Sequence, residues 1–187
     1  MMLLKIFSNK VIIMEKTRYE HDCEKCQWLC CVVPEINWKE FSFEKEIEVP
    51  CRHLEIKDCY KCKIHDVLED KWLTGCLKFT CNWAWQIVSE SYSKSWIYWD
   101  KNPESKDEIF NNYSSLKLAH ELIKLINENF EKIKTLSQED RWKLAKIKYK
   151  YEKLSFYFEN RKVLNLNQGE ILADLFEYTL LIWKYKN

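Results

Sequence analysis

Glycine and proline are scarce in this sequence: its 187 residues include 2 glycines and 3 prolines. A β-rich or loop-rich protein ordinarily has more of both, so their scarcity favours helices. Gly75 and Gly169 are too few and too far apart to build a glycine-rich nucleotide loop after a strand. We therefore expect no independent methyltransferase site.

Long hydrophobic runs and a surplus of one charge are absent as well. No uninterrupted stretch of about 18 apolar residues occurs, so the sequence predicts no transmembrane helix. The formal net charge is +1 and the pI is near 7.5, which gives no overall attraction for nucleic acid or an anionic membrane. The basic residues from Arg141 to Lys153 fit a solvated helix face, so nucleic acid is not a predicted partner.

Residues 1–22 precede the first cysteine and are predicted to be an N-terminal extension. Residues 1–14 are largely apolar, but Lys5, Asn9 and Lys10 interrupt them and no small-residue cleavage site follows. This pattern favours a cytoplasmic protein, with a secretory signal peptide as the alternative. Met14 is a second candidate start, and residues 1–13 would then lie outside the native protein.

Cysteine is abundant, and all nine cysteines fall between Cys23 and Cys81. They open with Cys23-x-x-Cys26-x-x-x-Cys30-Cys31, a density that core packing alone does not require. We interpret the segment as a metal site. The alternative is a disulfide framework, which belongs to small secreted domains in oxidising compartments.

The spacing of the first cysteines predicts how they divide between sites. If this segment is helical, Cys23, Cys26 and Cys30 lie within about 60° on one face, and Cys31 is turned about 100° away from Cys30. We therefore predict that the first three share one centre, while Cys31 joins the later cysteines. The candidate metal ligands are Cys23, Cys26, Cys30, Cys31, Cys51, Cys59, Cys62, Cys76 and Cys81, together with His65.

Thiolate-rich sets suit either zinc in a closed tetrahedral site or iron in an iron–sulfur cluster. With zinc, two structural sites would fold a binding or adaptor module. With iron, the protein would act in electron transfer, redox sensing or metal delivery. The sequence contains no Gly-x-Ser-x-Gly, no His-Glu-x-x-His and no P-loop, so we predict no catalytic residues, no organic cofactor and no enzyme activity independent of the metal.

The second half of the chain shows helical periodicity and contains no cysteine. Apolar residues at helical spacings predict three helices, with capping signals at Ser105-x-x-Glu108, at Ser137 and at Asn167. A proline followed by a capping signal places the domain boundary at residues 101–104. Residues 101–187 are thus predicted to form a three-helix bundle. Its apolar stripes exceed what three helices bury, which predicts a protein partner or a homodimer.

Residues 23–100 are predicted to form a small metal-stabilised domain with little regular structure, packed on the bundle, so the fold class is mainly α. The aromatic residues Trp83, Trp85, Trp96, Tyr98 and Trp99 are expected to pack around the metal segment. His120 lies in a helical stretch without cysteines and is not a predicted ligand.

Residues 23 to about 90 also carry a resemblance to a known family. The opening cysteine motif, followed by Cys51-Arg52-His53-Leu54, Cys62-Lys63-Ile64-His65 and Cys76 to Cys81, resembles the YkgJ-type cysteine-cluster family, described as a zinc- or iron-chelating domain. The resemblance implies eight ligands in two four-ligand sites: Cys23, Cys26, Cys30, Cys31, Cys51, Cys62, Cys76 and Cys81. Cys59 departs from the family pattern. The pentapeptide repeats that follow the domain in one similar branch are missing here, so that branch's further properties do not carry over.

Overall fold

The computed structural model describes residues 23, 26–39, 41, 43–57, 60–159 and 167–184. The predicted N-terminal extension at residues 1–22, the candidate second start at Met14 and the candidate ligand Cys59 lie outside the described residues. The elements are η2 (Leu29–Cys31), β1 (Leu54–Glu55), β2 (Lys61–Cys62), η3 (His65–Val67), α2 (Thr74–Lys78), α3 (Ala84–Ser93), α4 (Pro103–Glu128), α5 (Phe130–Lys134), α6 (Gln138–Glu159) and α7 (Gln168–Lys184).

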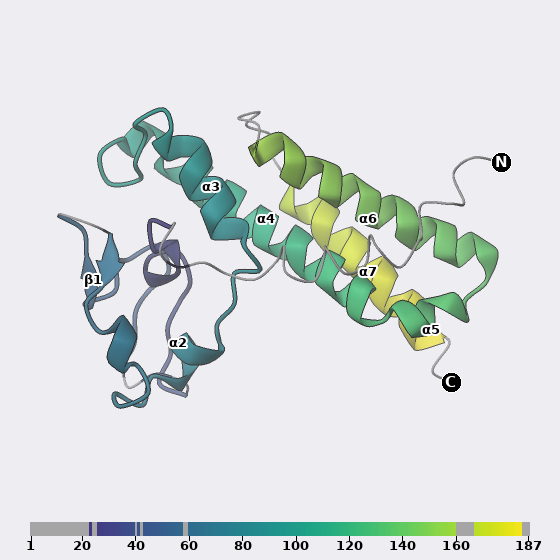
Figure 1. Cartoon of the computed structure of the whole chain (residues 1–187), viewed down its shortest axis with the longest axis horizontal. Helices are drawn as coiled ribbons and strands as arrows, with labels where there is room; N and C mark the ends of the chain where they lie inside the picture. Colours follow the sequence, from purple (N-terminus) through teal and green to yellow (C-terminus); the bar gives the residue numbers. More distant parts are fainter. Residues whose placement is uncertain are drawn as a thin grey trace.

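The chain is mainly helical and has two visibly different ends (Figure 1). At one end lie the short elements of the cysteine region, with β1 and β2 paired antiparallel so that Leu54 faces Cys62. At the other end the long helices α4, α6 and α7 run side by side. Helix α3 connects the ends and packs on α4 and α6. The predicted fold class, mainly α with little regular structure in the cysteine region, is confirmed.

The long helices enclose the bundle core. Residues at helical spacings on α4, including Ala119, Leu122 and Ile123, are fully buried against α6 and α7. The core comprises Ala119, Leu122, Ile123, Ile126, Ile133, Leu136, Leu144, Ile147, Tyr151, Ile171 and Tyr178. The first predicted helix is interrupted at Asn129, whose side-chain amide donates to the Leu125 carbonyl at 3.0 Å, and the short α5 follows.

Two of the three predicted helix caps are confirmed. The Ser137 hydroxyl accepts from the Asp140 amide at 3.1 Å, and Asn167 Oδ1 accepts from the Gly169 amide at 2.9 Å. The prediction of a cap at Ser105 is wrong, because α4 already begins at Pro103. A proline suits the first helical position, since its φ is fixed near the helical value and that position needs no donor.

A second hydrophobic core lies in the cysteine region and extends into the bundle. It contains Leu29 and Val32 near η2, Trp85 on α3, and residues 109–116 at the beginning of α4. Helix α4 therefore contributes its first half to one core and its second half to the other. The long helix fixes the cysteine region to the bundle.

The aromatic residues of the boundary divide into buried and exposed groups. Trp85 and Trp99 belong to the core of the cysteine region, as predicted, and Tyr98 stacks on Tyr60 with ring centroids 5.7 Å apart. Trp96, in contrast, is 81% exposed, so the expectation that it packs around the metal segment is wrong.

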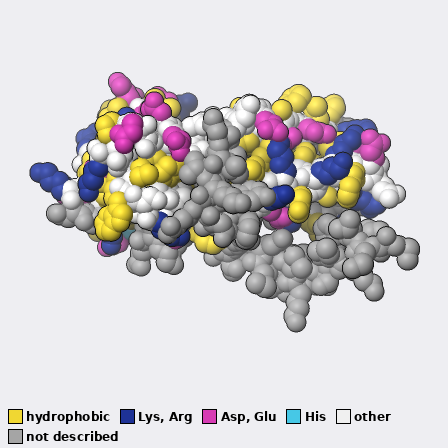
Figure 2. Space-filling view, turned by 90° about the horizontal axis from the view of Figure 1, so that it is seen from above, with side chains coloured by type: hydrophobic (Ala, Val, Ile, Leu, Met, Phe, Trp, Pro, Cys, Tyr) yellow, Lys and Arg dark blue, Asp and Glu magenta, His cyan; other side chains and the backbone are white. Residues whose placement is uncertain are grey.

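Acidic and basic side chains are interspersed along the helical end, with hydrophobic side chains between them (Figure 2). Among the described helices, none combines the length and the apolar content that a membrane span requires.

Candidate metal centre

The segment that carries the first cysteines is not one continuous helix. Trp28 has a left-handed backbone (φ 49°), and the three-residue η2 follows it. The premise of a continuous helix is therefore wrong for this segment. The turn at Trp28 replaces it, and Cys26 and Cys31 are held by separate local structures.

Cys31 lies beside Cys30 and beside the two later cysteines Cys51 and Cys62. The Cys51 amide donates to the Cys31 carbonyl at 2.6 Å, and the Cys31 side chain forms hydrogen bonds with the thiols of Cys30, Cys51 and Cys62. These hydrogen bonds raise the pKa of Cys31 and lower the pKa of Cys51 to about 7 and of Cys62 to about 6. Burial, together with the charges of the nearby Cys30, Cys51 and Cys62 when ionised, raises the pKa of Cys76 to about 12. We call Cys31, Cys51, Cys62 and Cys76 the second cysteine group.

The other cysteines gather around Cys81. Cys81 lies close enough to Cys23, Cys26 and Cys30 for their charges to interact when the thiols ionise. Burial raises the pKa of Cys26, and it raises the pKa of Cys81 to about 12. We call Cys23, Cys26, Cys30 and Cys81 the first cysteine group. Cys30 has neighbours in both groups, so the two groups are adjacent.

Cys76 and Cys81 are close in sequence but have different neighbours. Cys76 lies inside α2, whereas Cys81 follows an extended residue at Phe79 and precedes α3. Gly75, the residue before Cys76, is a buried helical residue. A Cβ at Gly75 would come within 2.2 Å of the Phe41 ring, so close packing of this ring, and not a turn, requires the glycine.

Four of the cysteine sulfurs accept a hydrogen bond from the backbone amide two residues later. The Trp28 amide lies 3.0 Å from Cys26 Sγ, and the His53 amide lies 3.5 Å from Cys51 Sγ. The amides of Ile64 and Trp83 bond Cys62 and Cys81 in the same way. Hydrogen bonds of this kind favour the ionised form of the acceptor. Each cysteine group contains two sulfurs held in this manner.

A buried lysine lies beside the second cysteine group. Lys45 is only 7% exposed, and its ammonium donates to the carbonyls of Val32 at 2.8 Å and Glu46 at 2.9 Å. Burial lowers the pKa of Lys45, and the nearby Cys51 and Cys31 oppose that shift when ionised. No described carboxylate forms an ion pair with it. Sequence reasoning missed this residue because one lysine in a charged segment carries no distinguishing signal.

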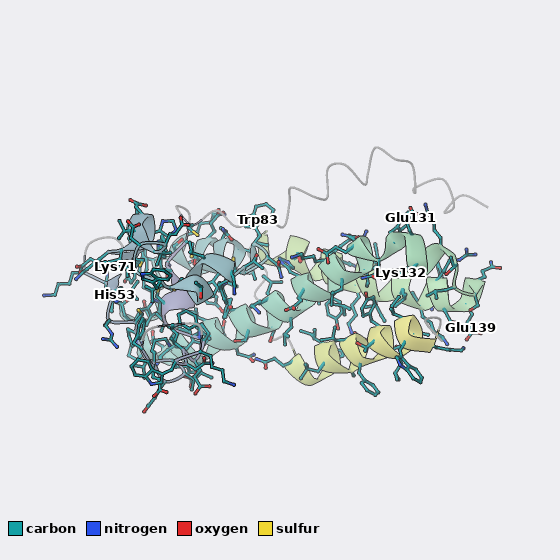
Figure 3. The ribbon with its side chains drawn as sticks, turned by 90° about the horizontal axis from the view of Figure 1, so that it is seen from below. His53, Lys71, Trp83, Glu131, Lys132 and Glu139 are labelled. Atoms are coloured by element: carbon teal, nitrogen blue, oxygen red, sulfur yellow. The ribbon has the colours of Figure 1, made fainter. Side chains whose placement is uncertain are left out.

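The histidines of the region have other contacts. His65 Nδ1 lies 3.3 Å from the Asp66 carboxylate, and its ring stands edge-on to Trp28 with centroids 4.7 Å apart. His53 lies near Lys71 (Figure 3), and burial together with Arg52 and Lys71 lowers its pKa. His65 remains a neighbour of Cys62.

The described cysteines lie near one another, but they do not form a metal coordination sphere. All eight described cysteines are thiols, so no disulfide joins any two of them. Across the described ranges, no group of three or more Cys, His, Asp or Glu side chains could hold a metal ion as the side chains stand. The chemistry of the donors, soft sulfurs with amide hydrogen bonds and a buried cation nearby, nevertheless fits a thiolate-bound metal.

Comparison with known proteins finds one similar bacterial protein. The uncharacterized protein YybG of Bacillus subtilis (strain 168) is 30% identical to this chain over 179 residues, which is 92% of this chain and 61% of the relative. The chain thus spans less than two thirds of that relative's length, and the relative's name assigns it no activity. No family model matches the chain. No solved structure matches it.

Proposed function

We propose that the cysteine region binds two metal ions through thiolates, most simply two zinc ions, and that these ions stabilise a binding or adaptor module. The observation that carries the proposal is the set of four amide-to-sulfur hydrogen bonds, at Cys26, Cys51, Cys62 and Cys81. A neutral thiol is a weak acceptor and gains little from an amide donor, whereas a thiolate gains much more. Local backbone turns that aim amides at sulfur are therefore suited to metal-bound thiolates.

The two cysteine groups supply the donors for two ions. Cys23, Cys26, Cys30 and Cys81 would hold one ion, and Cys31, Cys51, Cys62 and Cys76 the other. Four cysteine thiolates are a common ligand set of structural zinc, which bonds sulfur at about 2.3 Å. A site closed by four protein ligands leaves no position for substrate or water, which favours a structural role over a catalytic one.

Charge supports the same assignment for the second group. Four thiolates around Zn²⁺ leave a net charge of −2, and a buried charge is costly unless it is compensated. The buried ammonium of Lys45, which lacks a carboxylate partner among the described residues, lies beside Cys31 and Cys51 and would supply this compensation. With neutral thiols as its neighbours, the lysine charge would be left with the electrostatic attraction of Glu35, which forms no ion pair with it.

Metal ions would add stability to the short elements of the cysteine region. Apart from α3, its described elements are two strands of two residues each, two three-residue 3₁₀ helices and the five-residue α2. Structural zinc contributes on the order of 10 kcal/mol of folding free energy per site. Ligands must lose their protons to bind, so the thiol arrangement of the structure would contract around the metal as the protons leave.

The proposed role as a binding module is supported by the exposed surface of the helical half. Helix α7 exposes Leu172, Phe176, Leu180 and Trp183, which follow one another at helical spacings of three or four residues. An apolar stripe of this kind is typical of a surface that contacts a protein or a second copy of the chain. We propose a protein partner of this kind, in the cytoplasm, and neither nucleic acid nor membrane as a partner.

Elemental analysis tests the proposal. The whole chain is purified without oxygen and without a metal-affinity tag, and its metal content and visible spectrum are measured. About two zinc ions per chain and no visible band are expected. Iron with sulfide and a broad charge-transfer band would replace the zinc assignment by an iron–sulfur protein, and no bound metal would refute both.

Two cysteine variants make the test specific. Cys62→Ser removes a sulfur of the second group and is expected to lower the content to about one zinc per chain. Cys59→Ser is the matched control, since Cys59 stands outside the implied ligand set, and it should keep both ions. Equal metal contents in the two variants would contradict the assignment of Cys62 as a ligand.

A further inference from the structure

A buried histidine joins the turn after Cys81 to the helical bundle. His120 lies on α4 and is fully buried. Its Nδ1 lies 2.6 Å from the Asn82 carbonyl, to which it donates, and its Nε2 lies 2.7 Å from the Ser155 hydroxyl on α6. One side chain thus connects three segments that are distant in sequence.

The turn that His120 contacts is conformationally unusual. Asn82 and Trp83 both have left-handed backbones, with φ of 48° and 65°, which residues other than glycine rarely adopt in succession. This conformation allows the amides of Trp83 and Trp85 to donate to the Cys81 sulfur, and it begins α3 at Ala84. Such backbone persists where surrounding contacts hold it.

The remaining contacts of the turn are local. The Asn82 amide donates to the Thr80 hydroxyl at 3.2 Å, only two residues away. The bond from His120 is the one that reaches this turn from the bundle side among the hydrogen bonds described. Trp83, the next residue, lies where the cysteine region meets the helices (Figure 3).

The Ser155 hydroxyl extends the connection along α6. Its oxygen also lies 3.0 Å from the Tyr151 carbonyl one turn earlier, so its one hydrogen is shared between this carbonyl and His120 Nε2, and Ser155 is itself buried. Helix α3, which starts at the turn, packs on both α4 and α6. A displacement of the Cys81 turn would therefore have to move α3 against both helices.

We infer that His120 is a positioning residue for the metal site of the first cysteine group, and that it couples occupancy of that site to the packing of α3, α4 and α6. The inference rests on the proposed function, because it assumes that Cys81 binds a metal. It concerns the first group alone, since the second group lies beside the β1–β2 hairpin and beside Lys45.

The kinetics of zinc release test the inference. The zinc-loaded chain is mixed with the chelator 4-(2-pyridylazo)resorcinol, and the two ions are expected to leave in two phases. The phase that disappears in Cys26→Ser belongs to the first group. His120→Leu removes both hydrogen bonds and should speed this phase by roughly 10- to 100-fold, the range typical of lost supporting contacts at metal sites. The other phase should change little.

Two further variants separate positioning from stability. His120→Asn keeps a donor at the place of Nδ1 and should restore much of the slow release. Leu144→Ala enlarges the bundle core away from the turn, so it should lower the unfolding temperature without changing the ratio of the two rates. Should His120→Leu fail to fold, Ser155→Ala takes its place and is expected to give a smaller effect on the same phase.

The possible failures can be distinguished. A wild-type chain without bound metal overturns both the proposed function and this inference. Two bound zinc ions, with equal effects of His120→Leu and Leu144→Ala on both phases, leave the proposed function intact and overturn the inference.

Discussion

The two ends of the molecule are built in different ways. In the bundle, long helices bury side chains such as Leu122 and Ile123 at regular spacings, and hydrophobic contacts define the structure. In the cysteine region the elements are two to five residues long, apart from α3, and several residues have left-handed backbones. Burial stabilises both ends, but in the cysteine region the buried side chains come from short elements and turns instead of long helices.

The boundary between the two ends is not a gap. Residues 109–116 of α4 belong to the core of the cysteine region, and residues 119–126 of the same helix belong to the bundle core. Leu154 of α6 packs against both cores. A change in the cysteine region should therefore also affect the first half of α4.

Metal removal should produce the largest difference in stability between the two ends. A strong chelator is expected to unfold the cysteine region, because each structural zinc contributes on the order of 10 kcal/mol. Hydrogen exchange followed by mass spectrometry should show lost protection at residues 26–57 and in the first half of α4. Protection of α6 and α7 should persist. Uniform loss of protection along the chain would show that the bundle depends on the metal as well.

Replacement of the buried lysine should change the metal-loaded protein more than the metal-free one. Lys45→Met removes the cation beside Cys31 and Cys51, and loss of one partner from a buried pair of charges costs about 3 kcal/mol. Chemical unfolding with and without zinc measures both states. The metal-free protein should lose less stability, because removal of a buried charge offsets part of the cost of losing the hydrogen bonds to the Val32 and Glu46 carbonyls.

Lys63→Met is the control for that prediction. Lys63 directly follows strand β2, which contains Cys62 of the second cysteine group. Its ammonium pairs with the Glu55 carboxylate at 2.9 Å on the surface. Surface ion pairs contribute little, so zinc affinity should stay near the wild-type value. Equal effects of the two lysine variants would argue against a buried counter-charge.

The two glycines offer a matched comparison, one in each region. Gly75→Ala forces the Phe41 ring to move, because the new Cβ would lie 2.2 Å from the ring, and overpacking of this kind costs about 1–3 kcal/mol. Gly169→Ala lies in the first turn of α7, where the nearest atom is Asn167 Oδ1 at 3.2 Å. Thermal unfolding should show clear destabilisation at Gly75 and little change at Gly169. Relief by Phe41→Leu would identify the ring as the cause.

The smallest expected effect concerns a helix cap. Ser137→Ala removes the acceptor of the Asp140 amide and should lower the unfolding free energy by about 1 kcal/mol, with no change in metal content. Ser105→Ala is the control, because Ser105 lies inside α4 and its hydroxyl caps nothing at the helix start. Similar losses in the two variants would contradict the cap assignment.

The same contrast explains what the sequence could predict. Helical spacing and capping residues predicted α4, α6 and α7, because both signals are local and have a fixed period. The error at Ser105 arose because two start signals competed within three residues, and Pro103 prevailed. The interruption at Asn129 had no comparable signal.

The sequence showed which cysteines this region contains, but it did not predict the path of the backbone that brings them together. The spacing argument that divided the cysteines assumed a helix that is absent, and Cys31 lies beside Cys30 as well as beside Cys51 and Cys62. The separation of Cys76 from Cys81, the role of Lys45 and the contact of His120 with Asn82 all depend on tertiary structure. Neighbours that are tens of residues apart leave no local pattern in a single sequence.

X-ray absorption at the zinc edge measures directly whether cysteine sulfurs bind the zinc ions. For the whole chain purified without oxygen, we expect about four sulfur ligands at about 2.3 Å around each zinc. A first shell dominated by nitrogen and oxygen, or a chain that binds no zinc, would contradict it.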